Sequence, residues 1–381
     1  MAESTVLELK QNEIGDRKQR NSNLELMRIL LMLGMIAHHY VVNSGVEALY
    51  DLSAFSWDVW FLQIFGMFGK TGINCFTLLT GYFMVKSNIT LKKFLKLYLE
   101  VKFYYIGCYL LFLVTGYEPF SALTLKSAVF NVLYELNWLY TGTYIVFFLF
   151  IPFLNALMGR LSRRQHGYLL LLGFCYYTLI STFTGADTFS YLGWMAVMYL
   201  LGGYLSLYGS RLPFWGSLRF AAAGLAISLA LMCFSVAAID LWGVPAGFDD
   251  YYYFVHDSHK ILALSCSVFL FLTFLNLPIA PNPWINRIAA STFGILLLHT
   301  NSGAMRRFLW EDLFDVCGAF ERGTALAWGI AAMVLVFFGA LVIDQLRIRF
   351  VERPFFRWLY GRSWMKKIEE KTDGLWKTVE K

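Results

Sequence analysis

The chain alternates long apolar runs with short polar segments. Ten of the runs are long enough to cross a hydrocarbon core about 30 Å thick. They lie near residues 24–44, 60–84, 95–116, 137–158, 167–184, 190–208, 215–239, 259–277, 287–304 and 324–346. The pattern predicts an all-α, polytopic membrane protein with about ten transmembrane helices.

Lysines and arginines gather in alternate loops between these runs. They precede the first run, separate the second from the third, the fourth from the fifth and the sixth from the seventh, and recur beyond the tenth. The intervening loops at 45–58 and 240–255 hold neither residue, although the last such loop carries Arg306, Arg307 and Arg322. Because basic loops stay on the cytoplasmic side of a membrane, the distribution predicts that both termini are cytoplasmic.

This topology divides the chain into three expected segments. Residues 1–23 form a cytoplasmic N-terminal segment, residues 24–350 form the membrane domain, and residues 351–381 form a cytoplasmic tail. No small-residue cleavage site follows the first apolar run, so we expect that run to remain as a span rather than to act as a signal peptide. The tail combines basic residues with tryptophans, which is typical of an amphipathic helix on an anionic inner leaflet.

The composition excludes several other classes of protein. Of the 381 residues, 58% are hydrophobic and only 15% are charged, which is too apolar for an ordinary soluble domain. The net charge of +6 does not indicate nucleic-acid binding, because the basic residues lie in loops between spans. The cysteines form no CxxC pair, and the HxxH pair of His256 and His259 has no third ligand at fixed spacing. We therefore expect neither a nucleic-acid partner nor a bound metal.

The first span keeps charged and titratable residues that are rare in membrane helices. The stretch from 23 to 40 contains Glu25, Arg28, His38 and His39. A charged group at mid-bilayer costs about 2.5–3.5 kcal/mol. Arg28 and His39 are eleven positions apart, which puts them on one helix face about 16 Å from each other. Headgroup anchoring and helix packing would explain each residue alone, but the pair favours a site where a guanidinium binds an anion and an imidazole moves a proton.

A polar stripe also follows the second apolar run. Lys70, Asn74, Thr77 and Gly81 are spaced at helical intervals and share one face. Small residues on such a face often form a packing seam between membrane helices. Packing alone does not explain a buried lysine, so we expect Lys70 to meet an acid or to line an aqueous cavity at the level of His39.

The third run begins with three lysines whose role the sequence leaves open. Lys92, Lys93 and Lys96 form either an ordinary cytoplasmic flank or a phosphate-binding mouth beside Arg28.

The fourth and ninth runs add aromatic and imidazole candidates. Trp138 and Tyr140 belong either to an interfacial aromatic belt or to a platform for a sugar. His299 is expected at about the depth of His39, where it is either a packing residue or part of the site.

Several motifs, in order, resemble those of the acyltransferase-3 family of integral-membrane acyltransferases, in particular its members that modify cell-surface polysaccharides. The family's hallmark is an arginine and a histidine separated by ten residues in the first span, here Arg28 and His39. The other motifs are NSNLELMR before and in the first span, GKTGINCFTLLTGYF in the second, NWLYTGTYIVFFLFIPFLN in the fourth and STFGILLLHT in the ninth. The resemblance covers about residues 20–350, and Leu297 stands where the family often has a tyrosine.

The resemblance implies an O-acetyltransferase of the bacterial plasma membrane. Its co-substrate would be cytoplasmic acyl-CoA, usually acetyl-CoA, without a permanently bound cofactor, and its acceptor a hydroxyl of a carbohydrate or lipid-linked glycan. It also implies that His39 is the general base or acyl relay and that Arg28 binds the donor. Many relatives add an extracytoplasmic hydrolase-like domain, which does not follow the tenth run here. We therefore expect the chain either to acylate the acceptor itself or to pass the acyl group to a partner.

The resulting hypothesis is O-acyl transfer through the membrane domain. The phosphates of CoA would meet Arg28 and the lysines at 92–96, and His39 would take the proton of the acceptor hydroxyl. Lys70 or Asn74 would stabilise the oxyanion of the thioester. The remaining candidates for oxyanion or acceptor binding are Thr77, His38, His299, Trp138 and Tyr140.

Two other functions fit the same polar stripes. A transporter or flippase for lipid-linked sugars would use them to line a path, although the chain shows no internal repeat. A sensor built on a decayed acyltransferase scaffold would bind a ligand without turnover. Membrane lipids and a second copy of the chain, in a homodimer, are further partners that the sequence allows.

Overall fold

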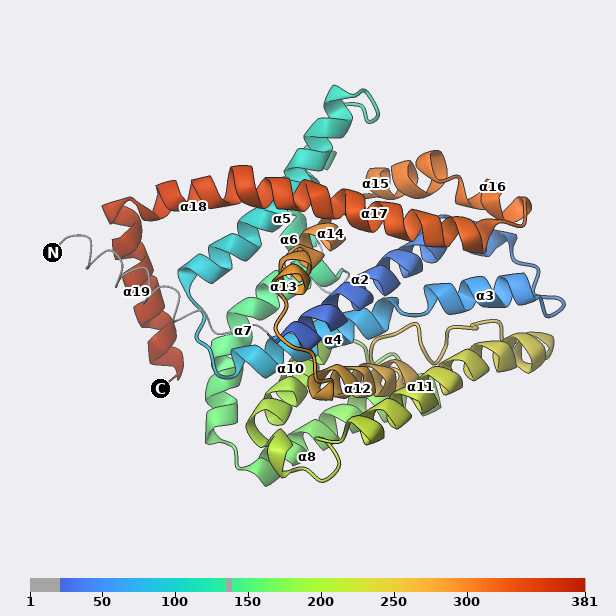
Figure 1. Cartoon of the computed structure of the whole chain (residues 1–381), viewed down its shortest axis with the longest axis horizontal. Helices are drawn as coiled ribbons and strands as arrows, with labels where there is room; N and C mark the ends of the chain where they lie inside the picture. Colours follow the sequence, from blue (N-terminus) through green and yellow to red (C-terminus); the bar gives the residue numbers. More distant parts are fainter. Residues whose placement is uncertain (1–20, 135–138, 381) are drawn as a thin grey trace.

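The fold is described from a computed structural model, in which residues 21–134 and 139–380 are described and residues 1–20, 135–138 and 381 lie outside the described part. The described residues form helices and connecting loops, with no strand among them. The helices in the first half are α2 (Ser22–Val42), α3 (Trp57–Gly66), α4 (Gly69–Met84), α5 (Leu91–Val114), α6 (Ala122–Tyr134), α7 (Tyr140–Arg160), α8 (Arg163–Phe174) and α9 (Ser181–Thr184). Those in the second half are α10 (Tyr191–Tyr208), α11 (Leu218–Ala238), α12 (Ile261–Asn276), α13 (Pro283–Ala289), α14 (Thr292–His299), α15 (Gly303–Arg307), α16 (Val316–Glu321), α17 (Ala325–Arg347), α18 (Arg353–Tyr360) and α19 (Ser363–Glu380) (Figure 1).

Seven helical segments of the described chain are long and apolar enough to cross a membrane, so the protein is an all-α polytopic membrane protein. They span residues 22–42, 91–114, 140–160, 163–184, 191–211, 218–246 and 325–360, and they correspond to seven of the ten expected runs. The second and ninth runs are each divided into two helices, α3–α4 and α13–α14, and the eighth is the 16-residue α12. The number of ten spans and the cytoplasmic position of both termini stay predictions.

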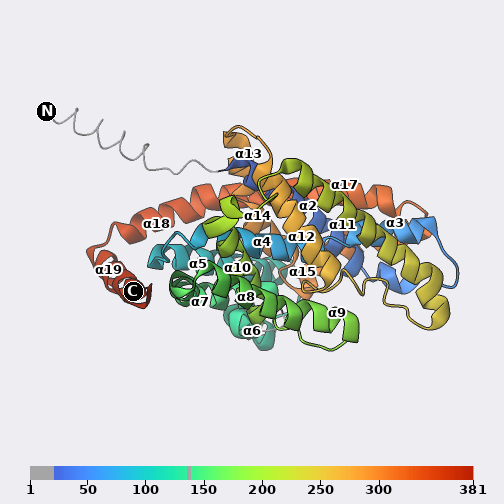
Figure 2. The ribbon, with the colours of Figure 1, turned by 90° about the horizontal axis from the view of Figure 1, so that it is seen from below.

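Helix α2 lies at the centre of the molecule and organises the packing around it. It contacts α3, α4, α12, α13, α14 and α17. Its apolar side chains, such as Met32, Ile36 and Tyr40, are almost completely buried, as expected for a helix enclosed by other helices rather than by lipid. A turned view shows the same helix enclosed between α17 on one side and α4 and α12 on the other (Figure 2).

Helices α4 and α10 pack closely because two glycines face the partner backbone. A Cβ atom at Gly81 would collide with the carbonyl group of Tyr199, and one at Gly202 would collide with that of Leu78. The predicted polar stripe of the second run is therefore, at Gly81, a small-residue seam of the kind that membrane helices use.

We expect Gly81→Ala to destabilise the protein because the added methyl group has to push α4 and α10 apart. Overpacking of this kind typically costs about 1–3 kcal/mol. The measurement is thermal unfolding of the purified protein in lipid nanodiscs, with Gly107→Ala as the matched control, since a Cβ at Gly107 meets no atom within 4 Å. Equal melting temperatures for the two variants would contradict the close packing described here.

A break between two helices brings a backbone carbonyl group to the C-terminal part of α2. Helix α3 ends at Gly66 and α4 begins at Gly69. An unbroken span would satisfy its carbonyl groups internally, but the ends of these short helices leave carbonyl groups available to side chains. The imidazole of His38, on α2, contacts such a carbonyl group, that of Gly66 at the end of α3.

The segment expected as one amphipathic helix from 351 onward contains two helices. A π-helical stretch joins α17 to α18, and α19 turns back at the end of the molecule opposite to α3 and α16 (Figure 1). The carboxylate of Asp373 accepts a hydrogen bond of 2.8 Å from the backbone N–H of Leu91, in the first turn of α5. Trp376 packs against the main core, whereas Trp358 and Trp364 are exposed. Contact of this tail with a lipid surface stays a prediction.

Candidate functional site

His39 and His299 form a hydrogen-bonded pair between α2 and α14. His39 Nδ1 lies 3.0 Å from His299 Nε2, and His299 Nδ1 lies 2.6 Å from the backbone oxygen of Ile295. The two rings are 5.1 Å apart between centroids. The sequence predicted that both histidines lie at about the same depth, and the structure brings them into direct contact.

The backbone carbonyl determines which ring nitrogens carry protons when both rings are neutral. The oxygen of Ile295 only accepts, so His299 Nδ1 carries a proton and donates it. His299 Nε2 is then an acceptor, and His39 Nδ1 must donate to it. His39 Nε2 is therefore left with a free lone pair, which is the state that a general base requires.

His38 is held by a separate carbonyl group next to this pair. Its Nδ1 lies 2.6 Å from the backbone oxygen of Gly66, at the end of α3. Gly69 leaves room for the ring, because a Cβ at that position would overlap the imidazole. The Nε2 of a neutral His38 is therefore also an acceptor. The ring centroids of His38 and His39 are 5.3 Å apart.

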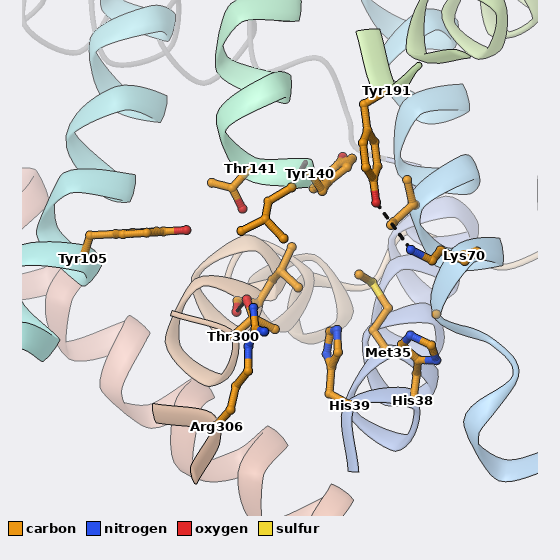
Figure 3. A pocket seen from close by; sticks show the side chains of 14 residues that line it. Met35, His38, His39, Lys70, Tyr105, Tyr140, Thr141, Tyr191, Thr300 and Arg306 are labelled. Carbon is orange, nitrogen blue, oxygen red and sulfur yellow. Dashed lines mark hydrogen bonds between the residues drawn. The ribbon is translucent and has the colours of Figure 1, made fainter. Parts of the chain in front are cut away.

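Both α2 histidines line a cavity of about 130 Å³. A volume of this size holds about four water molecules, or the reacting groups of larger substrates. Lys70 also lines it, as expected, and its Nζ lies 3.4 Å from the hydroxyl of Tyr191 (Figure 3). The complete lining is Met35, His38, His39, Gly69, Lys70, Ile73, Tyr105, Leu139, Tyr140, Thr141, Tyr191, Leu296, Thr300 and Arg306.

Arg28 lines a second cavity, of about 220 Å³, on the N-terminal side of the histidines. Its Nη1 lies 3.4 Å from Glu25 Oε2, while its Nε is shielded from water and has no hydrogen-bond partner among the described residues. Tyr140 and Leu296 line both cavities and form the wall between them. The predicted single passage from Arg28 to His39 is therefore two adjoining cavities with a shared wall.

The three lysines near the start of α5 point to different neighbours. Lys92 lies over the ring of Tyr360, and Lys93 donates to the hydroxyl of Ser87 and to the backbone oxygen of Asn88. Lys96 lines a third cavity, of about 900 Å³, and forms an ion pair of 2.9 Å with Glu352. Arg287, Arg347 and Arg353 also line this third cavity.

Asn74 and Thr77 lie outside the lining of the histidine cavity. The amide of Asn74 donates to the backbone oxygen of Ser258 at 2.7 Å and accepts from the indole of Trp194 at 2.8 Å. The hydroxyl of Thr77 donates to the backbone oxygen one turn earlier. Of Lys70 and Asn74, the two residues predicted to stabilise the oxyanion, the structure thus brings Lys70 and not Asn74 to the cavity of His39. His38 and Tyr140 line this cavity as well, and His299 contacts His39. Trp138, a further candidate, lies outside the described residues.

Sequence reasoning did not select several residues of the site. Arg306, Tyr105, Tyr191 and Thr300 line the histidine cavity, although no spacing within one helix connects them to His39. The sequence did contain an indication of Arg306, because it is a basic residue in a loop that is predicted to lie on the outer side. Its position follows from α15, which is separated from the end of α14 by three residues.

A buried ion cluster, also missed, ties α5 to α17 beside the third cavity. Arg347 contacts Asp344 at 2.8 Å, Glu100 at 2.8 Å and Glu352 at 2.9 Å. Asp344 further accepts a hydrogen bond of 2.7 Å from the hydroxyl of Tyr104. Two carboxylates within apolar runs were the available signal, since such groups are rare unless they are paired.

Comparison with known proteins identifies the family of the chain. The family model described as "Acyltransferase domain" matches residues 21–345, which is most of the chain and includes every residue of the histidine cavity. Comparisons with curated proteins and with solved structures gave no match. The chain therefore belongs to the acyltransferase-3 family and is a membrane acyltransferase.

Proposed function

We propose that this acyltransferase moves an acetyl group from cytoplasmic acetyl-CoA to a hydroxyl of a cell-surface polysaccharide or a lipid-linked glycan. The observation that carries the proposal is the hydrogen-bonded chain from Ile295 through His299 to His39, because it leaves His39 Nε2 unprotonated at a cavity. An imidazole held in one tautomer by a second group is the arrangement that activates hydroxyl nucleophiles.

In the proposed reaction, the acceptor oxygen forms a bond to the thioester carbonyl carbon while His39 Nε2 takes the hydroxyl proton. The bond between carbon and sulfur then breaks, and the departing thiolate receives the proton from His39. A relay in which His39 is first acetylated and then passes the acetyl group to the hydroxyl uses the same atoms. In both routes His299 acts as a positioning residue, because it contacts the ring of His39 rather than the reacting atoms.

Lys70 is the proposed partner of the oxyanion that forms on the thioester oxygen. It lines the same cavity as His39, and within the described part of the chain its Nζ contacts a neutral phenol, that of Tyr191, 3.4 Å away. A lysine that is not engaged in an ion pair can stabilise a developing negative charge directly, because no existing contact with a carboxylate has to be broken first.

The donor is proposed to reach His39 along α2. The cavity of about 900 Å³, with Arg287 and Arg353 on its wall, has room and positive charge for the nucleotide part of CoA. Arg28 would hold a phosphate or a polar group nearer to His39. The acyl end then has to pass the wall formed by Tyr140 and Leu296, so a side-chain rotation there is part of the proposal.

The decisive test uses purified protein in nanodiscs with radiolabelled acetyl-CoA and an oligosaccharide acceptor. Transfer of the label to the acceptor, with release of one CoA for each acetyl group, supports the proposal. If the protein moves a lipid-linked sugar between leaflets and never releases CoA, it is the transporter considered above, and the proposal is wrong.

We expect Arg28→Gln to raise the KM for acetyl-CoA about tenfold with a smaller change in kcat. The variant loses one charge-assisted hydrogen bond to the donor, and this loss affects the bound substrate and the transition state alike. Steady-state kinetics with acetyl-CoA as the varied substrate is the measurement. Arg219→Gln, at an exposed position in α11, is the matched control. An unchanged KM in the Arg28 variant would remove this residue from the donor site.

A further inference from the structure

Three arginines interrupt the predicted outer loops, and only one of them lacks a carboxylate. Arg307 pairs with Glu118, and Arg322 Nη1 lies 3.1 Å from Asp315 Oδ2. Arg306 forms no ion pair with any described residue, and its Nε is shielded from water without a hydrogen-bond partner. A guanidinium in this state needs an anion or water to satisfy its donors.

Arg306 reaches the histidine cavity from the side opposite to Lys70. Both cations line the cavity, and in Figure 3 the ring of His39 lies between them. None of the described residues of the lining carries a carboxylate. The cavity therefore holds two positive charges, and a proton taken up by His39 during transfer would add a third.

The proposed reaction supplies only one negative charge to balance these cations. That charge is the oxyanion of the transferring acetyl group, which is assigned to Lys70. Among the described residues the charge of Arg306 has no counter-ion, and like charges held close together in a low-dielectric site are costly. An anion that arrives with a substrate would balance this charge.

We propose that Arg306 binds an anionic group on the acceptor, so that the acceptor is an acidic glycan bearing a carboxylate or a phosphate. This inference rests on the acetyl transfer proposed above and specifies its substrate. The planar guanidinium presents paired N–H donors that match the oxygens of both groups. Thr300 lies next to Arg306 in Figure 3, and its hydroxyl donates to the backbone oxygen of Leu296 at 2.7 Å. The hydroxyl oxygen of Thr300 can therefore still accept a hydrogen bond from a sugar hydroxyl.

The experiment compares methyl glycosides of glucose, glucuronic acid and glucose 6-phosphate as acceptors for the full chain in nanodiscs with acetyl-CoA. We expect at least one acidic glycoside to be acetylated with a kcat/KM at least about tenfold above that of methyl glucoside, the usual effect of one charge-assisted hydrogen bond. Arg306→Gln should abolish this preference, Arg306→Lys should restore part of it, and Arg307→Gln, whose parent arginine is already paired, should retain it.

Two results would overturn the proposal. One is a wild-type protein that uses methyl glucoside as well as both acidic glycosides. The other is a raised KM for acetyl-CoA in Arg306→Gln with the acidic preference intact, which would assign this guanidinium to a phosphate of the donor.

Binding without turnover separates this inference from the proposed function. The same three methyl glycosides are prepared in radiolabelled form, and their equilibrium binding is measured on the His39→Ala variant, with and without Arg306→Gln. Tighter binding of an acidic glycoside that depends on Arg306 supports the anion site even if the wild type transfers no acetyl group. Equal binding of all three glycosides contradicts it even if acetyl transfer is observed.

Discussion

His39→Ala is expected to lower acetyl transfer at least about a hundredfold, since general-base catalysis by a positioned side chain typically contributes 10²–10⁴-fold. The variant removes the nitrogen that is left unprotonated by the chain of hydrogen bonds from His299 and Ile295. The loss should lie in kcat, because binding of acetyl-CoA near Arg28 does not use the imidazole. The measurement is label transfer from acetyl-CoA to the acceptor by purified protein in nanodiscs.

The control for this variant is His256→Ala, because His256 is exposed and does not line the histidine cavity. It should transfer acetyl groups at the wild-type rate. Thermal unfolding of both variants verifies that the loss in His39→Ala is catalytic. Wild-type transfer by a folded His39→Ala protein would remove His39 from the reaction and leave His38, which lines the same cavity, as the alternative base.

Arg347→Met is expected to have the largest effect on stability. The side chain of Arg347 is 5% exposed and faces Asp344 and Glu100, which are 0% and 9% exposed. Removal of the guanidinium leaves these carboxylates buried without their cation, and breaking a buried ion pair in this way typically costs about 3–5 kcal/mol. We expect a lower melting temperature in nanodiscs and a smaller yield of folded protein.

The matched control for this prediction is Arg349→Met, two residues further along, whose side chain is exposed. A double variant, Glu100→Gln with Arg347→Met, should recover part of the lost stability because it removes one uncompensated charge. If Arg347→Met and Arg349→Met unfold at the same temperature, the cluster does not hold α5 against α17 in the way described.

The apolar pattern was sufficient to predict the fold class, but it did not predict which spans are broken into shorter helices. Seven of the expected runs are continuous helical segments, whereas the second and ninth are broken and the eighth is short. Hydropathy averages over a window, so it detects that a segment is apolar but does not detect a turn such as the one between Gly66 and Gly69. These breaks matter because they supply the carbonyl partner of His38.

The site shows the same division between local and distant information. Helical spacing within one span predicted Arg28 and His39 on one face, and the polar stripe predicted that Lys70 meets an acid or lines a cavity. Lys70 lines the histidine cavity. The same stripe also selected Asn74, whose amide is instead used between α4, α10 and the loop before α12. A polar residue at a helical interval is equally suited to a cavity or to a packing contact, and only the neighbouring helices decide between them.

The sequence by itself determined the membrane class, the helical content and the presence of a cation and an imidazole on one face of the first span. These properties depend on hydrophobicity and on the regular geometry of a single helix, both of which are local. Only the tertiary structure decided that His299, 260 positions away, orients His39, and that Arg306 enters the cavity without a carboxylate while Arg307 has one. Such contacts join segments that are distant along the chain, so they depend on how the helices pack and where they break.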